Sequence, residues 1–290
     1  MKLKADCSYI LRNRRAGSGW AGILFLLPGL VGVSIFVLIP FGDVIKRSFY
    51  TALSGQFCGL QNYIRVLNNQ AFLLAAKNTF LFIAICLPIL LSISLLIALA
   101  MHSFSYLECF KVLYLLPMAM PAATIVLVWR LLFVKQGFLN VSVGGKIDFL
   151  HSEASFYVLL GTYVWKNIGY TVVLWLASLK VIPTELIEAA KVDGAGCMKS
   201  FFYITLPCLK GGLYTITVLS FLNAFKVFRE AYLVNGAYPP EEIYMLQHLF
   251  NNWYINLDFD KMAAGAVLAA VVLGSVAICL KRLWDKEENL

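Results

Sequence analysis

Polar and aromatic side chains recur at a regular spacing within an apolar stretch near the middle of the chain. Tyr163, Lys166, Asn167 and Tyr170 are spaced i, i+3, i+4 and i+7, which places them on one face of a helix. An asparagine amide both donates and accepts hydrogen bonds, and an aromatic ring packs against apolar surfaces. This face therefore suits a solute with many hydroxyl groups and apolar ring faces.

A second polar face follows further along the chain. Ser220, Asn223, Lys226 and Glu230 again fall on one side of a helix, and Asn223 lies near the middle of its apolar stretch, as Asn167 does in its own. If these apolar stretches span a membrane, as the composition below predicts, polar groups at their middle face protein or a water-filled path, because lipid exposure is costly. The predicted solute-pathway residues are Tyr163, Lys166, Asn167, Tyr170, Ser220, Asn223 and Lys226.

These residues also admit structural interpretations. Lys226, Arg229 and Glu230 could form ion pairs between helices or subunits, and the tyrosines could simply pack. Catalysis is not indicated, because the histidines lie far apart and no HExxH or GxSxG motif occurs. The cysteines form no CxxC pair, so neither a metal site nor a disulfide framework is expected.

The composition predicts an integral membrane protein. Of the 290 residues, 60% are hydrophobic and 14% are charged, whereas soluble domains are about one quarter charged. The formal net charge is +8, but the basic residues are scattered between apolar runs. They are therefore expected to set membrane orientation, and nucleic-acid binding is not expected.

A helix needs about 20 largely apolar residues to cross a bilayer, and six segments of the sequence have about this length and composition. We expect an all-α fold of six transmembrane helices, with cytoplasmic tails at 1–18 and 281–290 and a six-helix permease domain at 19–280. The first segment is too long for a signal peptide and is predicted to be retained. The predicted spans are 19–42, 78–101, 112–134, 155–179, 211–234 and 262–280.

The loops differ in their content of lysine and arginine. The segments 1–18, 102–111, 180–210 and 281–290 together hold more of these residues than the opposite set of loops. Because cytoplasmic loops are enriched in Lys and Arg, both termini and the segment 180–210 are predicted to be cytoplasmic.

The segment 180–210 is too polar to span and too long for a simple turn. Apolar residues at helical spacing predict a short helix that Asp193-Gly194 ends, because glycine suits a left-handed C-terminal position. A second amphipathic helix is expected to follow and to end at Pro207. This composition alone also permits an interfacial helix lying on lipid.

The stretch EAAKVDGAGCMKSFFYITLP resembles the cytoplasmic EAA signature of ATP-binding-cassette (ABC) importer permeases. The resemblance implies a coupling helix that docks on an ATPase subunit. The residues that match the signature and would make this contact are Glu188, Ala189, Ala190, Asp193, Gly194, Ala195, Phe201 and Pro207.

Further stretches are similar to the carbohydrate permeases, in the maltose, multiple-sugar and glycerol-phosphate branch. They are GLQNYIRVL, AAKNTF, LPMAMPAATIVLVWRLLF and LNAFKVFREAYLVNGAYPPEE. By this resemblance, the maltose relative's sugar-contacting positions correspond to the solute-pathway residues above with Ala224 in place of Lys226. Only Tyr170 and Ser220 keep that relative's residue type, so maltose itself is not implied.

The resemblance implies a type I ABC importer permease in a bacterial cytoplasmic membrane, working by alternating access. Its partners would be a homologous second permease, two ATPase subunits, an extracytoplasmic solute-binding protein, a carbohydrate and membrane lipid. Gly145-Lys146 does not fit a P-loop, so no cofactor is expected in this chain, and ATP and Mg²⁺ would bind the ATPase subunits. The alternatives are an ABC permease for a non-sugar solute and an ion-coupled secondary transporter, which would need intramembrane carboxylates and inverted repeats.

Overall fold

The computed structural model describes residues 19–52, 54–104, 111–142, 144 and 148–288. Within these residues the fold is helical, and the only β-type pairing is an isolated bridge between Tyr50 and Phe57. The first half of the chain forms α2 (Gly19–Val33), the π-helical turn η1 (Ser34–Leu38), α3 (Ile39–Arg47), α4 (Gln61–Leu67), α5 (Gln70–Ser103), α6 (Lys111–Ala119), α7 (Ala122–Phe133) and α8 (Phe138–Ser142). The second half forms α9 (Ala154–Leu179), α10 (Thr184–Val192), α11 (Cys197–Ser200), the π turn η3 (Phe201–Thr205), α12 (Leu206–Cys208), α13 (Lys210–Phe225), α14 (Phe228–Asn235), the 3₁₀ turn η4 (Glu241–Ile243), α15 (Leu246–Ile255) and α16 (Phe259–Glu288).

Five helical segments in the described part of the chain are long and apolar enough to cross a membrane. They are Ile23–Arg47, Gln70–Ser103, Ala122–Ser142, Lys210–Asn235 and Phe259–Arg282. The predicted span at 155–179 coincides with α9, which is long enough but carries Lys166 and Asn167 at its centre. These polar residues lower its hydropathy, so the number of six spans stays a prediction.

Two predicted spans are interrupted in the structure. The span expected at 112–134 is divided between α6 and α7, because Pro121 cannot donate a backbone hydrogen bond and holds an extended conformation with ψ 142°. The span expected at 211–234 is divided at Lys226–Val227, between α13 and α14. The second break lies beside the cavity described below.

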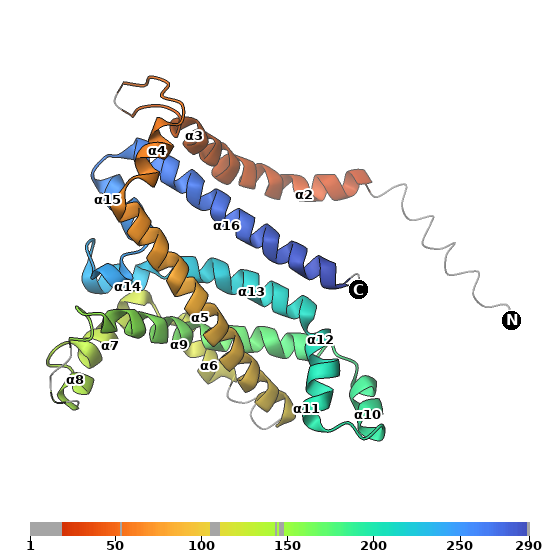
Figure 1. Ribbon diagram of the computed structural model, residues 1–290. Helices are drawn as coiled ribbons and strands as arrows, with labels where there is room; N and C mark the ends of the chain where they lie inside the picture. Colours follow the sequence, from red (N-terminus) through yellow and green to blue (C-terminus); the bar gives the residue numbers. More distant parts are fainter. Residues whose placement is uncertain (1–18, 53, 105–110, 143, 145–147, 289–290) are drawn as a thin grey trace.

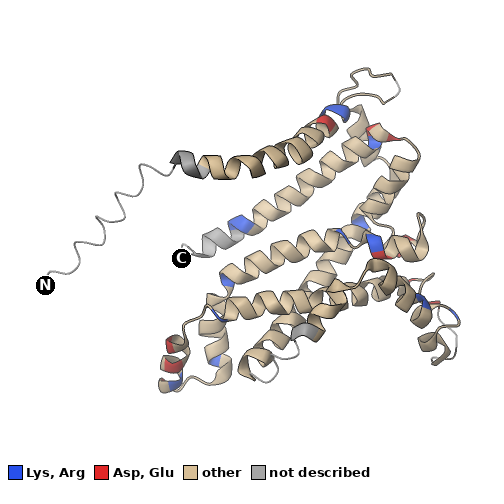
Figure 2. Ribbon diagram, turned by 180° about the vertical axis from the view of Figure 1, so that it is seen from behind, with Lys and Arg blue, Asp and Glu red and all other residues tan. Residues whose placement is uncertain are grey.

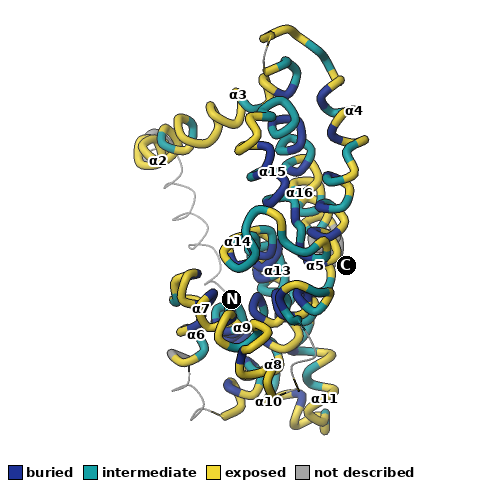
Figure 3. Tube along the Cα trace, turned by 90° about the vertical axis from the view of Figure 1, so that its left-hand side faces the viewer, coloured by how far each residue is buried: buried dark blue, intermediate teal, exposed yellow. Residues whose placement is uncertain are grey.

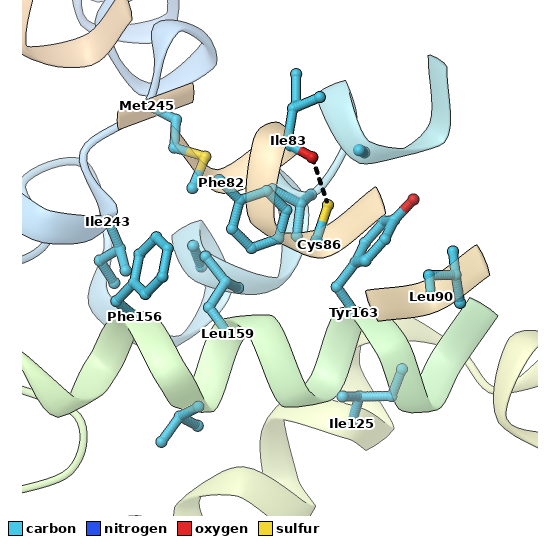
Figure 4. Close-up of a cluster of buried hydrophobic side chains, with 14 of the residues drawn as sticks. Phe82, Ile83, Cys86, Leu90, Ile125, Phe156, Leu159, Tyr163, Ile243 and Met245 are labelled. Carbon is cyan, nitrogen blue, oxygen red and sulfur yellow. Dashed lines mark hydrogen bonds between the residues drawn. The ribbon is translucent and has the colours of Figure 1, made fainter. Parts of the chain in front are cut away.

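The long helices share a buried core in which α5 packs against α9 and α13. Phe82 of α5 lies edge-on to Phe156 and Tyr163 of α9, with ring centroids 6.1 and 5.6 Å apart. Figure 4 shows these side chains interleaved with Met245, which follows η4. The core therefore ties α9 to α5 at the level of the predicted solute-pathway residues.

Small residues allow the helices around α9 to approach closely. A Cβ on Gly169 would lie 1.8 Å from the carbonyl oxygen of Tyr114 in α6, and a Cβ on Gly212 of α13 would lie 2.2 Å from the Ser178 hydroxyl. Close backbone approach at glycine is a common way of packing helices in membranes, where the hydrophobic effect does not drive their association. These contacts fix α6 and α13 against α9.

The first helix stands apart from the bundle. The most apolar part of the span Ile23–Arg47 contains no buried residue. Figure 3 shows α2 exposed along most of its length. The far end of this span, α3, packs against α16. The apolar surface of α2 is thus open to lipid or to another subunit.

The helices define two ends of the molecule. The start of α2, the end of α16 and the segment α10–α12 lie at the same end in Figure 1, while α4, α8 and α15 lie at the other. Charged residues gather towards these ends and around α14 in Figure 2, and the spans between them are largely uncharged. This arrangement matches the predicted alternation of the loops, although the side that faces the cytoplasm stays a prediction.

Candidate functional site

The segment between α9 and α13 begins with a helix that ends in a Schellman motif. Gly194 adopts a left-handed conformation with φ +77°, as its place in the sequence predicts. The N–H of Ala195 donates to the carbonyl of Ala190 at 2.8 Å, and the N–H of Gly194 donates to the carbonyl of Lys191 at 3.1 Å. These bonds turn the chain sharply from α10 towards α11.

The second half of this segment differs from the expectation at its end. Helical structure continues without interruption from Cys197 through Pro207 to Cys208. The π turn η3, in which the N–H of Leu206 donates to the carbonyl of Phe201, changes the hydrogen-bond register immediately before the proline. Because a register change of this kind can accommodate a residue that lacks an N–H, Pro207 does not break the helix.

The tip of the segment is exposed. Glu188, Ala189, Asp193, Gly194 and Pro207 are exposed, Phe201 and Ala195 are half-buried, and Ala190 is buried. Large apolar side chains are also exposed in this segment, namely Leu186, Val192, Met198, Phe202 and Tyr203. The segment therefore presents a mixed surface of carboxylates and apolar groups that the chain itself does not cover.

Both ends of the segment are anchored in one buried cluster. Ile182, which precedes α10, and Leu209, which follows α12, pack in a core with Trp175 of α9 and Ile216 of α13. The indole N–H of Trp175 also donates to the Ser94 hydroxyl of α5 at 3.1 Å. A displacement of the exposed tip would therefore be transmitted to α9 and α13 through packed side chains.

A cavity of about 360 Å³ opens between α6, α9, α13 and α14. Its volume is at the lower end of the ~300–1,000 Å³ typical of small-molecule sites. Five of the seven predicted pathway residues line it, and so do residues not included in that prediction. The predicted residues at the cavity are Tyr163, Lys166, Asn167, Asn223 and Lys226, and the additional polar ones are Thr162, Arg229 and Glu230.

Lys166 of α9 forms an ion pair with Glu230 of α14. The Glu230 side chain is 6% exposed and that of Lys166 is 21% exposed, so the pair is largely shielded from solvent. It lies at the cavity wall and links α9 to the helix that follows the break at Lys226–Val227. Glu230 thus pairs with a cation on another helix, and not with its sequence neighbours.

The two tyrosines and Ser220 occupy different positions. The Tyr163 hydroxyl donates to the backbone carbonyl of Ser220 at 2.8 Å, and the Tyr163 side chain is almost wholly buried. Ser220 is buried and, like the half-buried Tyr170, does not line the cavity. In this conformation Tyr163 joins α9 to α13 by packing and hydrogen bonding, while Tyr170 and Ser220 lie outside the cavity wall.

The two asparagines differ in the groups they leave available. The Asn167 amide N–H donates to the carbonyl of Tyr163 at 2.8 Å, so its oxygen is left as a hydrogen-bond acceptor. The Asn223 amide makes no hydrogen bond within the described residues and lines the cavity. Together they offer a bound solute both donors and acceptors.

A loop at the opposite end of the molecule is fastened to α5. Asn78 donates to the backbone carbonyls of Glu241 and Tyr244, and the Thr79 hydroxyl accepts from the backbone N–H of Leu246 at 3.0 Å. In α15, which follows this loop, His248 is fully buried and its Nδ1 accepts from the Met245 N–H at 3.2 Å. Burial lowers the pKa of His248 to about 4, so the ring is neutral at pH 7.

Residues 78–287 match the family model for the inner membrane component of binding-protein-dependent transport systems. This match covers well over half of the chain. The chain belongs to this family. The family match places it in the inner membrane, in agreement with its apolar helices.

This chain resembles two permeases over most of its length. It is 30% identical to the sn-glycerol-3-phosphate transport system permease protein UgpA of Yersinia pseudotuberculosis, over 92% of this chain and 95% of the relative. It is also 30% identical to the arabinooligosaccharides transport system permease protein AraP of Bacillus subtilis, over 88% of each.

Solved structures confirm the fold class. The inner membrane component superposes with a TM-score of 0.79 on a chain of a bacterial ABC transporter for the acidic polysaccharide alginate, at 20% identity over 92% of this chain and 96% of that one. A second structure of a bacterial alginate transporter, in complex with its alginate pentasaccharide-bound periplasmic protein, gives a TM-score of 0.77 at 22% identity, over 91% and 93% of the two chains. The predicted type I importer fold is therefore correct.

Proposed function

We propose that this chain is the permease subunit of an ABC importer that moves a carbohydrate or sugar derivative across the inner membrane by alternating access. The family match supports the transport role, and the similar permeases serve glycerol 3-phosphate and arabinooligosaccharides by their names. The similar alginate transporters support a carbohydrate cargo as well.

One observation carries the proposal. Two of the helices that contribute polar residues to the cavity, α9 and α13, also hold the exposed segment α10–α12 at its two ends. A solute in the cavity and a partner on the exposed segment would therefore act on the same two helices. This is the arrangement that a transport cycle driven from outside the chain requires.

The exposed segment is assigned the role of coupling helix. We propose that Glu188, Asp193 and the exposed apolar side chains around them dock on an ATPase subunit, and that Gly194 sets the angle between α10 and α11. When the ATPases close, the anchors Ile182 and Leu209 transfer the movement to α9 and α13. The cavity then changes its accessible side as the packed helices move as rigid bodies.

This mechanism requires partners. A second, homologous permease would complete the wall of the cavity and cover α2, two ATPase subunits would bind ATP and Mg²⁺, and a solute-binding protein would deliver the cargo. This subunit would have no catalytic function of its own. The lack of a P-loop in the sequence agrees with such a division of labour.

The test is uptake by the reconstituted importer. The chain is co-expressed with its genomic neighbours, purified as a complex and placed in proteoliposomes with ATP inside and the binding protein outside. Uptake of a radiolabelled carbohydrate that stops when the ATPases are inactivated is the expected result. Uptake that persists without ATP and follows an imposed proton or sodium gradient would instead assign a secondary transporter.

A further inference from the structure

We propose that the cavity selects an anionic solute, whose carboxylate or phosphate binds Lys226 and Arg229. This inference rests on the proposed transport function and specifies its cargo class. Three cations line the cavity, Lys166, Lys226 and Arg229, against the single carboxylate of Glu230. The wall therefore has an excess of positive charge.

The carboxylate is already committed to one of the three cations. Glu230 is buried and pairs with Lys166, so this lysine is neutralised by the protein itself. Lys226 and Arg229 form no ion pair within the described residues, and both are exposed at the cavity. The charge available to a solute thus comes from these two residues.

Their position makes unpaired charges costly. Lys226 follows the last residue of α13 and Arg229 lies in the first turn of α14, so both belong to the interrupted fifth span. Cations within a membrane-spanning segment are expensive unless they meet water, a counter-ion or a ligand. The positive end of the α14 dipole adds to the attraction for an anion at this point.

The two side chains suit anions in complementary ways. The Arg229 guanidinium can donate two parallel hydrogen bonds to a carboxylate or phosphate, and the Lys226 ammonium acts as a compact point charge. The amides of Asn167 and Asn223 remain for neighbouring hydroxyl groups. Uronic acids and sugar phosphates combine these features, whereas a neutral sugar would leave the two cations unpaired.

The experiment compares matched cargoes in the complete importer. Proteoliposomes holding the whole complex, with its cognate binding protein, receive labelled trigalacturonate, glucose 6-phosphate or neutral maltotriose. We expect ATP-driven uptake of at least one of the anionic probes and little uptake of the neutral one. The two anionic probes distinguish a carboxylate cargo from a phosphate cargo.

Variants assign the selectivity to the two cations. Lys226→Gln/Arg229→Gln is expected to lower uptake of the anionic probe at least tenfold at subsaturating concentration, with normal complex yield. Arg229→Lys should retain more uptake than Arg229→Gln, because it keeps the charge. Arg130→Gln, which removes an exposed cation of α7 away from the cavity, is the matched control and should change nothing.

Each remaining outcome is decisive. ATP-driven uptake of maltotriose that is unaffected by the double variant would overturn the anionic cargo and leave the importer in place. Loss of the second permease from the purified double variant would mean that the cations pair with that subunit, which also overturns the proposal. Uptake that needs no ATP and follows an imposed ion gradient would contradict the proposed carbohydrate importer itself.

Discussion

Lys166 and Glu230 are paired across two helices that reach the exposed segment by different routes. Lys166 is on α9, which enters that segment directly, and Glu230 is on α14, which is joined to it through α13. The pair lies where the fifth span is interrupted, at the wall of the cavity. It therefore joins α9 to α14 directly after the break that separates α14 from α13.

Removing one member of this pair is expected to be destabilising. Glu230→Ala leaves the Lys166 ammonium largely shielded and without a partner, a change that costs about 3–5 kcal/mol in buried pairs. The expected result is a lower melting temperature of the purified complex together with reduced uptake. Thermal unfolding followed by size-exclusion chromatography of the detergent-solubilised complex measures the first effect.

The double variant Lys166→Met/Glu230→Leu is the informative control. It removes both charges and leaves groups of similar volume, so it should recover most of the lost stability. A double variant that is less stable than Glu230→Ala would show that the ion pair itself, and not the avoidance of an unpaired charge, stabilises the fold. An unchanged melting temperature in Glu230→Ala would contradict the structural role altogether.

Gly194 gives a test of the coupling segment. Proline cannot adopt its φ of +77° and cannot make the hydrogen bond to Lys191, so Gly194→Pro should destroy the turn between α10 and α11. Because the turn is exposed and distant from the core, we expect normal membrane insertion but uptake reduced at least tenfold for the same ATPase activity. Simultaneous assays of uptake and phosphate release measure this ratio.

Two glycine controls separate conformation from simple crowding. Gly194→Asn should keep coupling, because asparagine tolerates the left-handed region. Gly196→Ala should be neutral, since Gly196 has φ −69° and no atom lies within 4 Å of its added Cβ. Wild-type uptake in Gly194→Pro would refute the lever role of this segment.

The sequence predicts the coupling segment better than the cavity, because the contacts that shape the coupling segment join residues close together in the sequence. Gly194 ends a helix through hydrogen bonds to residues three to five positions away, so local sequence specifies its conformation. The pairing of Lys166 with Glu230 joins residues 64 positions apart and depends on the packing of α9 against its neighbours. Periodicity placed Lys166 on a polar face but could not identify its partner.

The difference between local and long-range contacts also explains why some residues at the cavity differ from the sequence prediction. Tyr163 and Asn167 share a helix face, but a hydrogen bond to Ser220 turns the Tyr163 hydroxyl towards the core. The sequence shows Arg229 and Glu230 as charged residues within a span. The break at Lys226–Val227 that brings them to the cavity contains no proline or glycine, so the sequence does not predict it. Tertiary packing therefore decided the composition of the cavity wall.

Gly169 should be intolerant of any side chain. Its Cβ would lie 1.8 Å from the Tyr114 carbonyl oxygen, which belongs to the backbone of α6 and cannot move without displacing that helix. Overpacking of this kind costs about 1–3 kcal/mol, and more where backbone is the obstacle. We expect Gly169→Val to lower the yield of assembled complex severely. Gly161→Val, on the same helix with nothing within 4 Å, should assemble normally, and equal yields of the two variants would contradict the close approach of α6 and α9.

His248 makes stability depend on pH. The pKa of the His248 ring is about 4 in the folded protein and 6.5 when the ring is exposed in the unfolded chain. The ring is therefore neutral in the folded and the unfolded state well above pH 6.5, and the full stability is present there. As the pH falls from 6.5 to 4, the unfolded state binds a proton that the folded state excludes, and stability is lost at up to about 1.4 kcal/mol per pH unit.

The segment around α15 should therefore open on acidification. Hydrogen exchange of residues 244–253 in the purified complex, compared between pH 7 and pH 5, measures this opening after correction for the intrinsic exchange rate. His248→Phe should flatten the pH dependence, whereas His151→Gln, which removes an exposed histidine, should not, and an identical pH dependence in His248→Phe would assign the effect to another group.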